Sequence, residues 1–189
     1  WLRDLGCRGV TLGEGLAWLN AAGQRHPSEP GTPDPAPGRS SSANNHLPPV
    51  AITFDDGFRD FYTEAFPALQ RHGFTATMFL STAFIGDDRR GFRPVSLPSG
   101  TGRGRECLTW TEVCELRRAG MEFGSHTVNH PRLVELAWPQ IEAEIRDSKA
   151  AIEDRLGKAV TQFAYPYAFP QRDPVFTRSF RSLLAGAGY

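Results

Sequence analysis

Short segments rich in apolar residues recur along this chain, separated by longer stretches of helical periodicity. These segments cover residues 50–54, 74–80, 121–124 and 160–165. Each has the length of a strand and is bounded by Gly, Pro or Asp residues, which favour turns. The pattern predicts four strands, and the first of them reads as a buried strand.

Between and around these strands, apolar residues recur at helical spacing. The predicted helices cover residues 11–22, 60–72, 111–119, 138–156 and 174–185. Thr11 and Glu14 fit a capping box at the start of the first helix, and its leucines Leu12, Leu16 and Leu19 share one side. Helix 138–156 is the clearest, because an apolar stripe runs along it and i,i+4 ion pairs lie on its polar faces.

The alternation of strands and helices predicts an α/β fold with parallel strands and right-handed crossovers. A distorted or partial (β/α) barrel is the preferred architecture, and an open doubly wound sheet is the alternative. Two parts are expected along the chain. Residues 1–49 form an N-terminal helix and a Pro/Gly/Ser-rich loop, and residues 50–189 form the main domain. Residues 86–106 are expected to be a long surface insertion.

Composition narrows the class of protein. The chain has 189 residues, with 21 Lys and Arg against 21 Asp and Glu, so its formal charge is zero. Without a basic field, nucleic acid is not expected as a partner. No apolar run approaches the roughly 18 residues of a membrane span. The three cysteines are expected to be free thiols. Because the sequence begins at Trp1, it does not predict whether the protein is exported.

Polar residues cluster where three of the predicted strands end. Asp55-Asp56-Gly57 follows the first strand, Ser125 to His130 follows the third, and Tyr165-Pro166-Tyr167 closes the fourth. In parallel α/β folds, ligands bind beyond the carboxyl ends of the strands. The three clusters are therefore expected to meet at one rim of the domain.

His126 and His130 lie four residues apart, and Pro131 follows directly, which favours a loop over a helix. Two imidazoles and one aspartate make a His₂Asp set with open positions, a common catalytic arrangement for zinc or iron. The second aspartate is then free to act as a general base. The competing interpretation is a pair of surface or capping histidines and an ordinary Asp-Asp-Gly turn.

Taken together, these motifs resemble those of a known family. Thr53-Phe-Asp-Asp-Gly57, His126-Thr-Val-Asn-His130 and Phe163-Ala-Tyr-Pro-Tyr-Ala168 are similar to the first three motifs of the NodB-type polysaccharide deacetylases, carbohydrate esterase family four. The last motif resembles the Phe-Ala-Tyr-Pro-Tyr branch. The similarity spans residues 50–189 and implies a barrel of the polysaccharide deacetylase type.

The resemblance implies metal-dependent removal of acetyl groups from N-acetylated sugars such as N-acetylglucosamine. Asp55 would be the general base, and Asp56, His126 and His130 would hold a divalent cation, usually Zn²⁺. The backbone N–H of Tyr167 would stabilise the oxyanion. The side chains of the third cluster would line the saccharide groove: Tyr165, Pro166 and Tyr167. An acetylated oligo- or polysaccharide is the expected partner, and the resemblance favours an extracytoplasmic or cell-envelope location.

The sequence departs from the family pattern at three points. Ala164 stands where many members carry an arginine, and Ala168 stands where a glycine is usual and φ > 0 is easier. No histidine follows His130 to serve as general acid, so we expect that the chain is truncated at its C-terminus. Two other functions stay open: a carbohydrate-binding domain without turnover, and a hydrolase of other C–N amides. Oligomeric state is not predicted.

Overall fold

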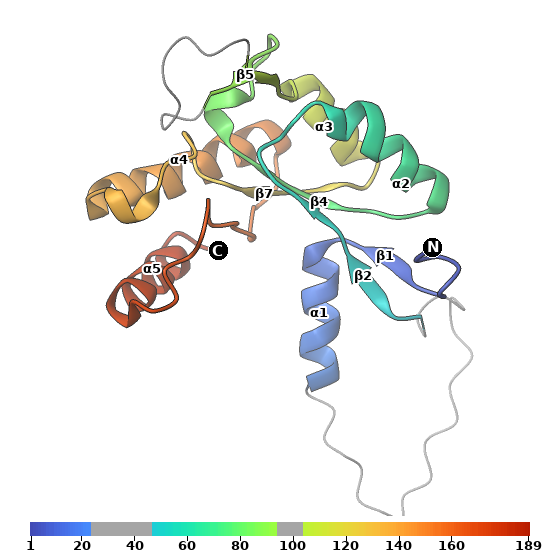
Figure 1. Ribbon diagram of the computed structural model, residues 1–189, viewed down its shortest axis with the longest axis horizontal. Coiled ribbons are helices and arrows are strands. Elements are labelled where there is room, and N and C mark those ends of the chain that lie inside the picture. Colours follow the sequence, from blue (N-terminus) through green and yellow to red (C-terminus); the bar gives the residue numbers. More distant parts are fainter. Residues whose placement is uncertain (24–46, 94–103) are drawn as a thin grey trace, which may run out of the picture.

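The computed structural model describes residues 1–23, 47–93 and 104–189 (Figure 1). The strands are β1 (Arg8–Val10), β2 (Pro49–Ala51), β3 (Thr53–Phe54), β4 (Thr77–Leu80), β5 (Gly91–Phe92), β6 (Arg105–Glu106) and β7 (Glu122–Ser125). The α-helices are α1 (Leu12–Gly23), α2 (Phe66–His72), α3 (Trp110–Arg118), α4 (Trp138–Leu156) and α5 (Pro174–Gly186). A π-helical segment, η2 (Phe61–Ala65), precedes α2, and two 3₁₀ turns are η3 (Thr82–Phe84) and η4 (Leu133–Glu135).

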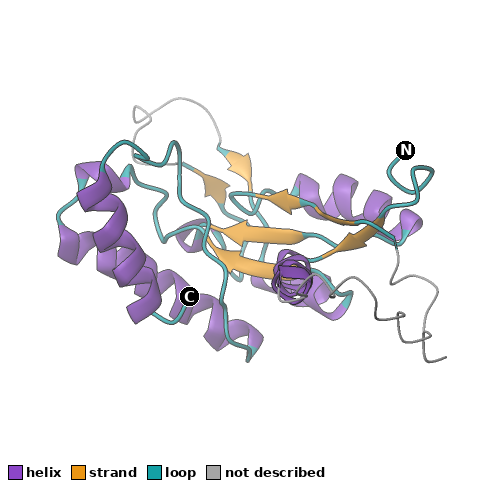
Figure 2. Cartoon of the chain, turned by 90° about the horizontal axis from the view of Figure 1, so that it is seen from below, coloured by secondary structure: helices purple, strands orange, loops and turns teal. Residues whose placement is uncertain are grey.

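A parallel sheet in the order β3-β4-β7 forms the centre of the molecule. β1 and β2 make a second parallel pair, and β5 and β6 make a short antiparallel one. Helices lie on both sides of these strands (Figure 2). The predicted α/β fold with parallel strands is therefore confirmed, although the strands of the described ranges do not close into a barrel.

The prediction of a buried strand over residues 50–54 was wrong in two respects. The segment is divided at Ile52 into β2, which pairs with β1, and β3, which pairs with β4. Ala51 and Thr53 are exposed and Ile52 and Phe54 are only partly buried, so alternate side chains of the segment face solvent. Strand β1 itself was not predicted, since three residues are too few for a recognisable pattern.

The predicted strand at residues 160–165 is also absent from the described chain. Only one bridge forms, between Ser125 and Phe163, and two hydrogen bonds flank it. The next bond of a parallel ladder would run from the N–H of Thr127 to the carbonyl of Ala164, but Thr127 has a φ of 71° and that carbonyl lies 2.8 Å from Nδ1 of His126 instead. The bond after it would need the N–H of residue 166, and Pro166 has none. The ladder ends there, and the chain turns away from the sheet.

The five predicted helices are confirmed. Gly73 and Gly157 end α2 and α4 in the left-handed conformation, with φ of 68° and 62°. Along α4, the predicted ion pairs Glu142–Arg146 and Lys149–Glu153 form at 2.7 and 2.8 Å. The apolar side of α1 is different, since Leu16 and Leu19 are 47% and 57% exposed. That stripe does not pack against the rest of the described chain as helical spacing would suggest.

Helix α1 is nevertheless tied to the sheet at its first turn. Its N–H groups at Leu12 and Gly13 donate to Thr77 Oγ1 (2.8 Å) and Glu122 Oε2 (3.0 Å), and the Thr77 hydroxyl donates to the same Glu122 oxygen (2.7 Å). The predicted capping box between Thr11 and Glu14 is present as well. Thr77 and Glu122 begin β4 and β7, so this network lies at the amino ends of the parallel strands.

The main core lies between the sheet and helices α2 to α4. It includes Met78 and Leu80 of β4, Leu116 of α3 and Ile152 of α4, all at most 1% exposed. A second cluster joins α4 and α5. Its buried members are Leu133, Ile141, Ile145 and Phe180.

The remaining predictions concern cysteines, the membrane and the two irregular segments. Cys7, Cys107 and Cys114 are free thiols, as predicted. Among the helices of the described ranges, none is long and apolar enough to span a membrane. Of the expected surface insertion, residues 91–92 and 105–106 form the β5–β6 pair, while residues 94–103 lie outside the described chain. The same holds for residues 24–46 of the Pro/Gly/Ser-rich loop.

Candidate metal centre

Asp56 is placed by a tight turn at the end of β3. Asp56 and Gly57 both adopt the left-handed conformation, with φ of 70° and 76°. A Cβ atom at Gly57 would lie 2.9 Å from side-chain carbons of Leu80 and Ile85, so the turn requires glycine for space as well as for φ. The turn leaves Asp55 exposed and Asp56 partly buried. The two adjacent carboxylates therefore occupy different environments.

The two histidines come from the loop that follows β7, as the sequence predicted. His126 donates its backbone N–H to Leu80, and His130 closes the loop four residues later. Both residues are buried, at 3% and 8% exposure. Thr127 and His130 adopt positive φ, of 71° and 54°, so the segment is a tight loop and not a helical turn.

These side chains from two strand ends converge on one point. The Nε2 atoms of His126 and His130 lie 3.5 and 3.3 Å from Oδ1 of Asp56. All three potential ligand atoms lie within 4.8 Å of one another. Within the described chain, this is the single cluster of histidine, cysteine and carboxylate side chains with the geometry to hold a metal ion.

The hydrogen bonds of the cluster fit a cation at its centre. Nδ1 of His126 lies 2.8 Å from the carbonyl oxygen of Ala164, which can only accept, so Nδ1 carries the proton and Nε2 of the neutral ring has a lone pair. That lone pair faces the Asp56 carboxylate. In the part of the chain that is described, the solvent-shielded Oδ1 of Asp56 has no hydrogen-bond donor. Electron-rich atoms facing one another without a proton between them are what a divalent cation stabilises.

Burial also sets the protonation of the cluster. Burial raises the pKa of the Asp56 carboxyl, and the nearby Asp55 adds to this against the opposing pull of the two histidines. Burial and the neighbouring His126 lower the pKa of His130, against the attraction of Asp56. His130 is therefore a neutral imidazole near pH 7. A metal binds the neutral form of the ring, in which one of the two nitrogens has a lone pair.

Aromatic rings surround His130. The ring of Tyr167, from the third predicted cluster, lies 4.6 Å from it, and the ring of Phe92 from β5 lies 5.3 Å from it. Tyr167 is half exposed, has a φ of 59°, and stacks under the guanidinium of Arg132 at 5.2 Å. Ala168, which stands where a glycine is usual, does not adopt a positive φ, and the left-handed residue of this turn is Tyr167.

A pocket of about 610 Å³ borders the cluster on the side of the two aspartates, which both line it, whereas His126 and His130 are not among its lining residues. Phe58 and Arg105 form another part of its wall, and the guanidinium lies 3.9 Å from the Phe58 ring while pairing with Asp60. Cys107 is fully buried, and burial raises the pKa of its thiol to about 12. It is therefore protonated and does not serve as a nucleophile.

Two predicted substrate residues lie elsewhere. The ring of Tyr165 packs against Phe169 and Phe180, at 5.0 and 5.3 Å, in the cluster between α4 and α5. Pro166 is buried. Their role in substrate binding stays a prediction. Sequence reasoning missed Phe92 and the Ala164 carbonyl, because one lies in the expected insertion and the other is a backbone atom of an ordinary residue.

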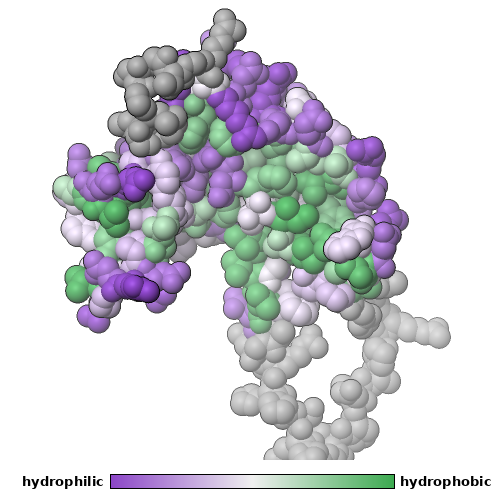
Figure 3. All heavy atoms as spheres, in the orientation of Figure 1, coloured by the Kyte–Doolittle hydropathy of each residue, from purple (hydrophilic) through white to green (hydrophobic). Residues whose placement is uncertain are grey.

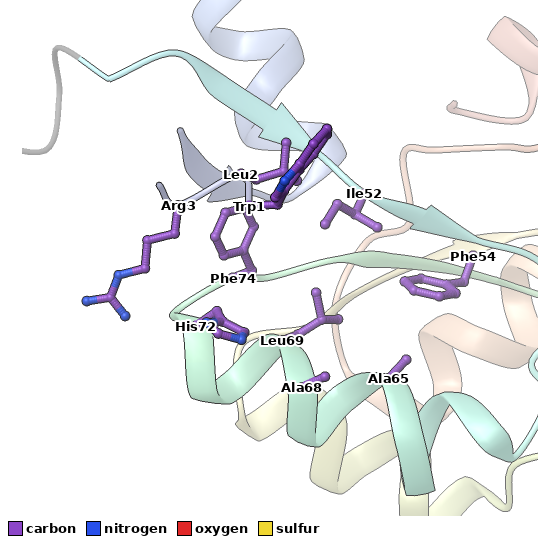
Figure 4. Close-up of a pocket in the computed structure, with 10 residues that line it drawn as sticks. All are labelled: Trp1, Leu2, Arg3, Ile52, Phe54, Ala65, Ala68, Leu69, His72 and Phe74. Atoms are coloured by element: carbon purple, nitrogen blue, oxygen red, sulfur yellow. The ribbon is translucent and has the colours of Figure 1, made fainter. Parts of the chain in front are cut away.

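A separate pocket of about 380 Å³ is almost wholly apolar (Figure 4). Trp1 and Leu2 face Leu69 and Phe74 across it, between the N-terminal segment and α2. Hydrophobic residues also gather on the molecular surface around this region (Figure 3). His72 is the one imidazole among its lining residues, and no carboxylate joins it, so this pocket has no set of groups for catalysis.

Comparison with known proteins identifies the family of this chain. A family model described as polysaccharide deacetylase matches residues 42–189. A curated relative, the putative polysaccharide deacetylase YxkH of Bacillus subtilis, is 31% identical over 117 residues, which are 62% of this chain and 36% of that protein. The chain thus spans about a third of the length of that relative.

Solved structures of deacetylases share the fold. The Streptococcus pyogenes deacetylase PplD, in complex with acetate, matches all of this chain and 65% of its own, with 24% identity and a TM-score of 0.67. IcaB from Ammonifex degensii matches all of this chain and 69% of its own, with 24% identity and a TM-score of 0.69. The BpsB deacetylase domain from Bordetella bronchiseptica matches all of this chain and 72% of its own, with 18% identity and a TM-score of 0.66. At these identities the likeness concerns the fold.

Proposed function

The chain belongs to the polysaccharide deacetylase family, and from this premise we propose that it is a metal-dependent hydrolase that removes acetyl groups from N-acetylated sugars of a polysaccharide or glycoconjugate. The observation that carries the proposal is the convergence of Asp56, His126 and His130 on one point. Two imidazoles and a carboxylate beside an open pocket suit zinc, which commonly keeps one position for water or substrate in catalytic sites.

A divalent cation, when bound, polarises the acetyl carbonyl and makes water more acidic. Residues of the chain orient the metal ligands and transfer the proton. The carbonyl of Ala164 fixes the ring of His126, and the tight turn at Gly57 directs Asp56 inward. Asp55, exposed in the same pocket, acts as the general base that takes a proton from the attacking water.

Tyr167 has two roles in the proposal. Its backbone N–H donates to the oxyanion that forms when water attacks the carbonyl, and a preorganised donor of this kind contributes about 3 kcal/mol. Its ring, beside His130, provides an apolar wall against which a sugar can pack. Because Tyr167 is held at φ of 59°, its N–H has a fixed orientation before substrate arrives.

Replacing the proposed base tests this mechanism. In zinc-loaded protein, Asp55→Asn is expected to lower kcat for acetate release from an N-acetylglucosamine oligomer by about 10²–10⁴-fold, the usual contribution of a general base. Zinc affinity, measured by competition with a chelating dye, should be unchanged, because Asp55 is not among the three converging residues.

Asp147→Asn is the matched control, since it makes the same change at an exposed aspartate of α4. It should leave both measurements unaltered. Acetate release that survives complete removal of metal would contradict metal dependence. Equal kcat in Asp55→Asn and the control would remove Asp55 from the mechanism.

A further inference from the structure

The loop that joins the two histidines has an unfavourable backbone. Thr127 and His130 both have positive φ, and Thr127 is β-branched, which makes this conformation especially rare. The geometry of the cluster depends on it, because His130 reaches Asp56 only if the chain reverses between residues 127 and 130. Contacts outside the loop must therefore hold it in place.

Contacts from η3 and α4 hold this loop. From η3, the N–H groups of Thr82 and Ala83 donate to the carbonyls of Thr127 and Val128, at 3.2 and 2.9 Å. Within the loop, the N–H of His130 donates to Thr127 Oγ1 at 3.1 Å. These bonds satisfy two carbonyls and one N–H of the loop. The N–H groups at its tip need other acceptors.

One carboxylate of α4 accepts from the tip of the loop. Glu144 Oε2 receives the backbone N–H groups of Val128 and Asn129, at 2.8 and 2.9 Å, and its Oε1 receives the side-chain amide of Asn129 at 2.7 Å. Two consecutive N–H groups that point at one anionic oxygen form a small anion-binding concavity. Hydrogen bonds to an ionised acceptor are about twice as strong as neutral ones.

The position of Glu144 is itself fixed by the core. Its neighbours on α4, Ile141 and Ile145, are at most 1% exposed and pack in the cluster with Leu133 and Phe180. Ser148, one turn further on, contacts Ser125 at the end of β7, 2.5 Å between hydroxyl oxygens. The carboxylate is thus presented from a rigid helix that packs on the strand preceding the loop.

We propose that Glu144 is a positioning residue of the metal centre, which holds the loop 126–130 in the conformation that directs His130 toward Asp56. This inference rests on the proposed function, since it assigns a role toward the same cation. His126 is held separately through the Ala164 carbonyl. Loss of Glu144 should therefore loosen one of the two imidazole ligands and leave the other in place.

The experiment measures metal binding by the metal-free protein, independent of turnover. Zinc affinity is determined by competition with a chelator, and cobalt(II) absorption reports the ligand geometry. Glu144→Ala is expected to weaken zinc binding by about 10–100-fold, the usual range for residues that orient metal ligands, and to alter the cobalt spectrum. Glu144→Gln keeps the length and one acceptor oxygen without the charge, so its affinity should fall between those of Glu144→Ala and the wild type.

Glu142→Gln is the matched control. It removes one negative charge from the same helix, but from an exposed side chain that pairs with Arg146. Zinc affinity and the cobalt spectrum should match the wild type. Hydrogen exchange at the amides of Val128 and Asn129 is an independent measurement in the metal-free protein, and it should become faster in Glu144→Gln but not in the control.

The outcomes separate the two proposals. Wild-type protein that binds neither zinc nor cobalt would overturn the proposed function together with this role. Wild-type binding that stays unchanged in Glu144→Gln and Glu144→Ala would overturn the positioning role alone. If Glu144→Ala fails to fold, the Glu144→Gln variant alone tests the positioning role, because it retains the size of the side chain. Equal affinity and equal amide exchange in Glu144→Gln and Glu142→Gln would reject the role.

Discussion

The two ends of the parallel strands carry polar clusters of opposite character. At the amino ends, Thr77 and Glu122 bind the first turn of α1, and the Glu122 oxygen accepts both from Gly13 and from the Thr77 hydroxyl. At the carboxyl ends, Asp56 and His130 face each other, and the shielded Oδ1 of Asp56 has no hydrogen-bond donor among the described residues.

The difference shows how a structural cluster is distinguished from a candidate ligand site. Buried polar groups are costly unless they are hydrogen-bonded, so a satisfied network such as that around Glu122 stabilises the fold by itself. A cluster that leaves acceptors facing one another is stable only if something else neutralises it. Sequence composition does not separate the two cases, since carboxylates occur at both ends.

The largest expected effect is at the carboxyl ends. Asp56→Asn should lower zinc-dependent acetate release by about a thousandfold or more, because metal polarisation is worth several kcal/mol and about 1.4 kcal/mol is tenfold in rate. The metal-free variant should be no less stable than the wild type in urea unfolding, because burial disfavours the ionised carboxylate that the change removes. A variant that unfolds more easily without metal would make Asp56 a structural residue, like Glu122.

The amino ends should respond in the opposite way. Glu122→Ala leaves the N–H of Gly13 and the fully buried hydroxyl of Thr77 without their acceptor, so the free energy of unfolding should fall by about 1–3 kcal/mol. Urea unfolding measures this. Zinc affinity should stay at the wild-type value. Asp147→Ala, the same truncation at an exposed carboxylate of α4, is the control and should leave both measurements unchanged. Weakened zinc binding in Glu122→Ala would show that the two ends are coupled.

A smaller effect concerns the pKa of His130, which burial and His126 hold below its usual range. In metal-free protein, NMR titration of its ring should give a pKa below 6.5. Asp56→Asn should lower the pKa further, because the nearby carboxylate favours the charged imidazole.

The corresponding change in stability has a definite sign. Between the lowered pKa of folded His130 and 6.5, the unfolded chain binds more protons than the folded one, so stability of the metal-free protein from this group rises with pH. This contribution of His130 to stability is lost as the pH falls below 6.5. A titration midpoint at or above 6.5 would mean that burial does not dominate at this site.

Much of the fold follows from local pattern. The five helices could be predicted because apolar spacing and ending glycines act within a few residues, as Gly157 does at the end of α4. The strand predictions were less accurate where pairing decided the outcome. Residues 160–165 have the composition of a strand, but Ser125 pairs with Phe163 alone. The next ladder bond would need the carbonyl of Ala164, and that carbonyl lies 2.8 Å from Nδ1 of His126 instead.

The sequence by itself determined the chemistry of the candidate site: Asp55-Asp56-Gly57 after one strand and His126 to His130 after another, at ends that parallel pairing brings to one edge. Only the tertiary structure decided how that chemistry is held. The Ala164 carbonyl behind His126 and the Glu144 carboxylate behind the loop lie 38 and at most 16 residues from the groups they contact. Such contacts depend on how helix and strand pack, and no local pattern of residues encodes them.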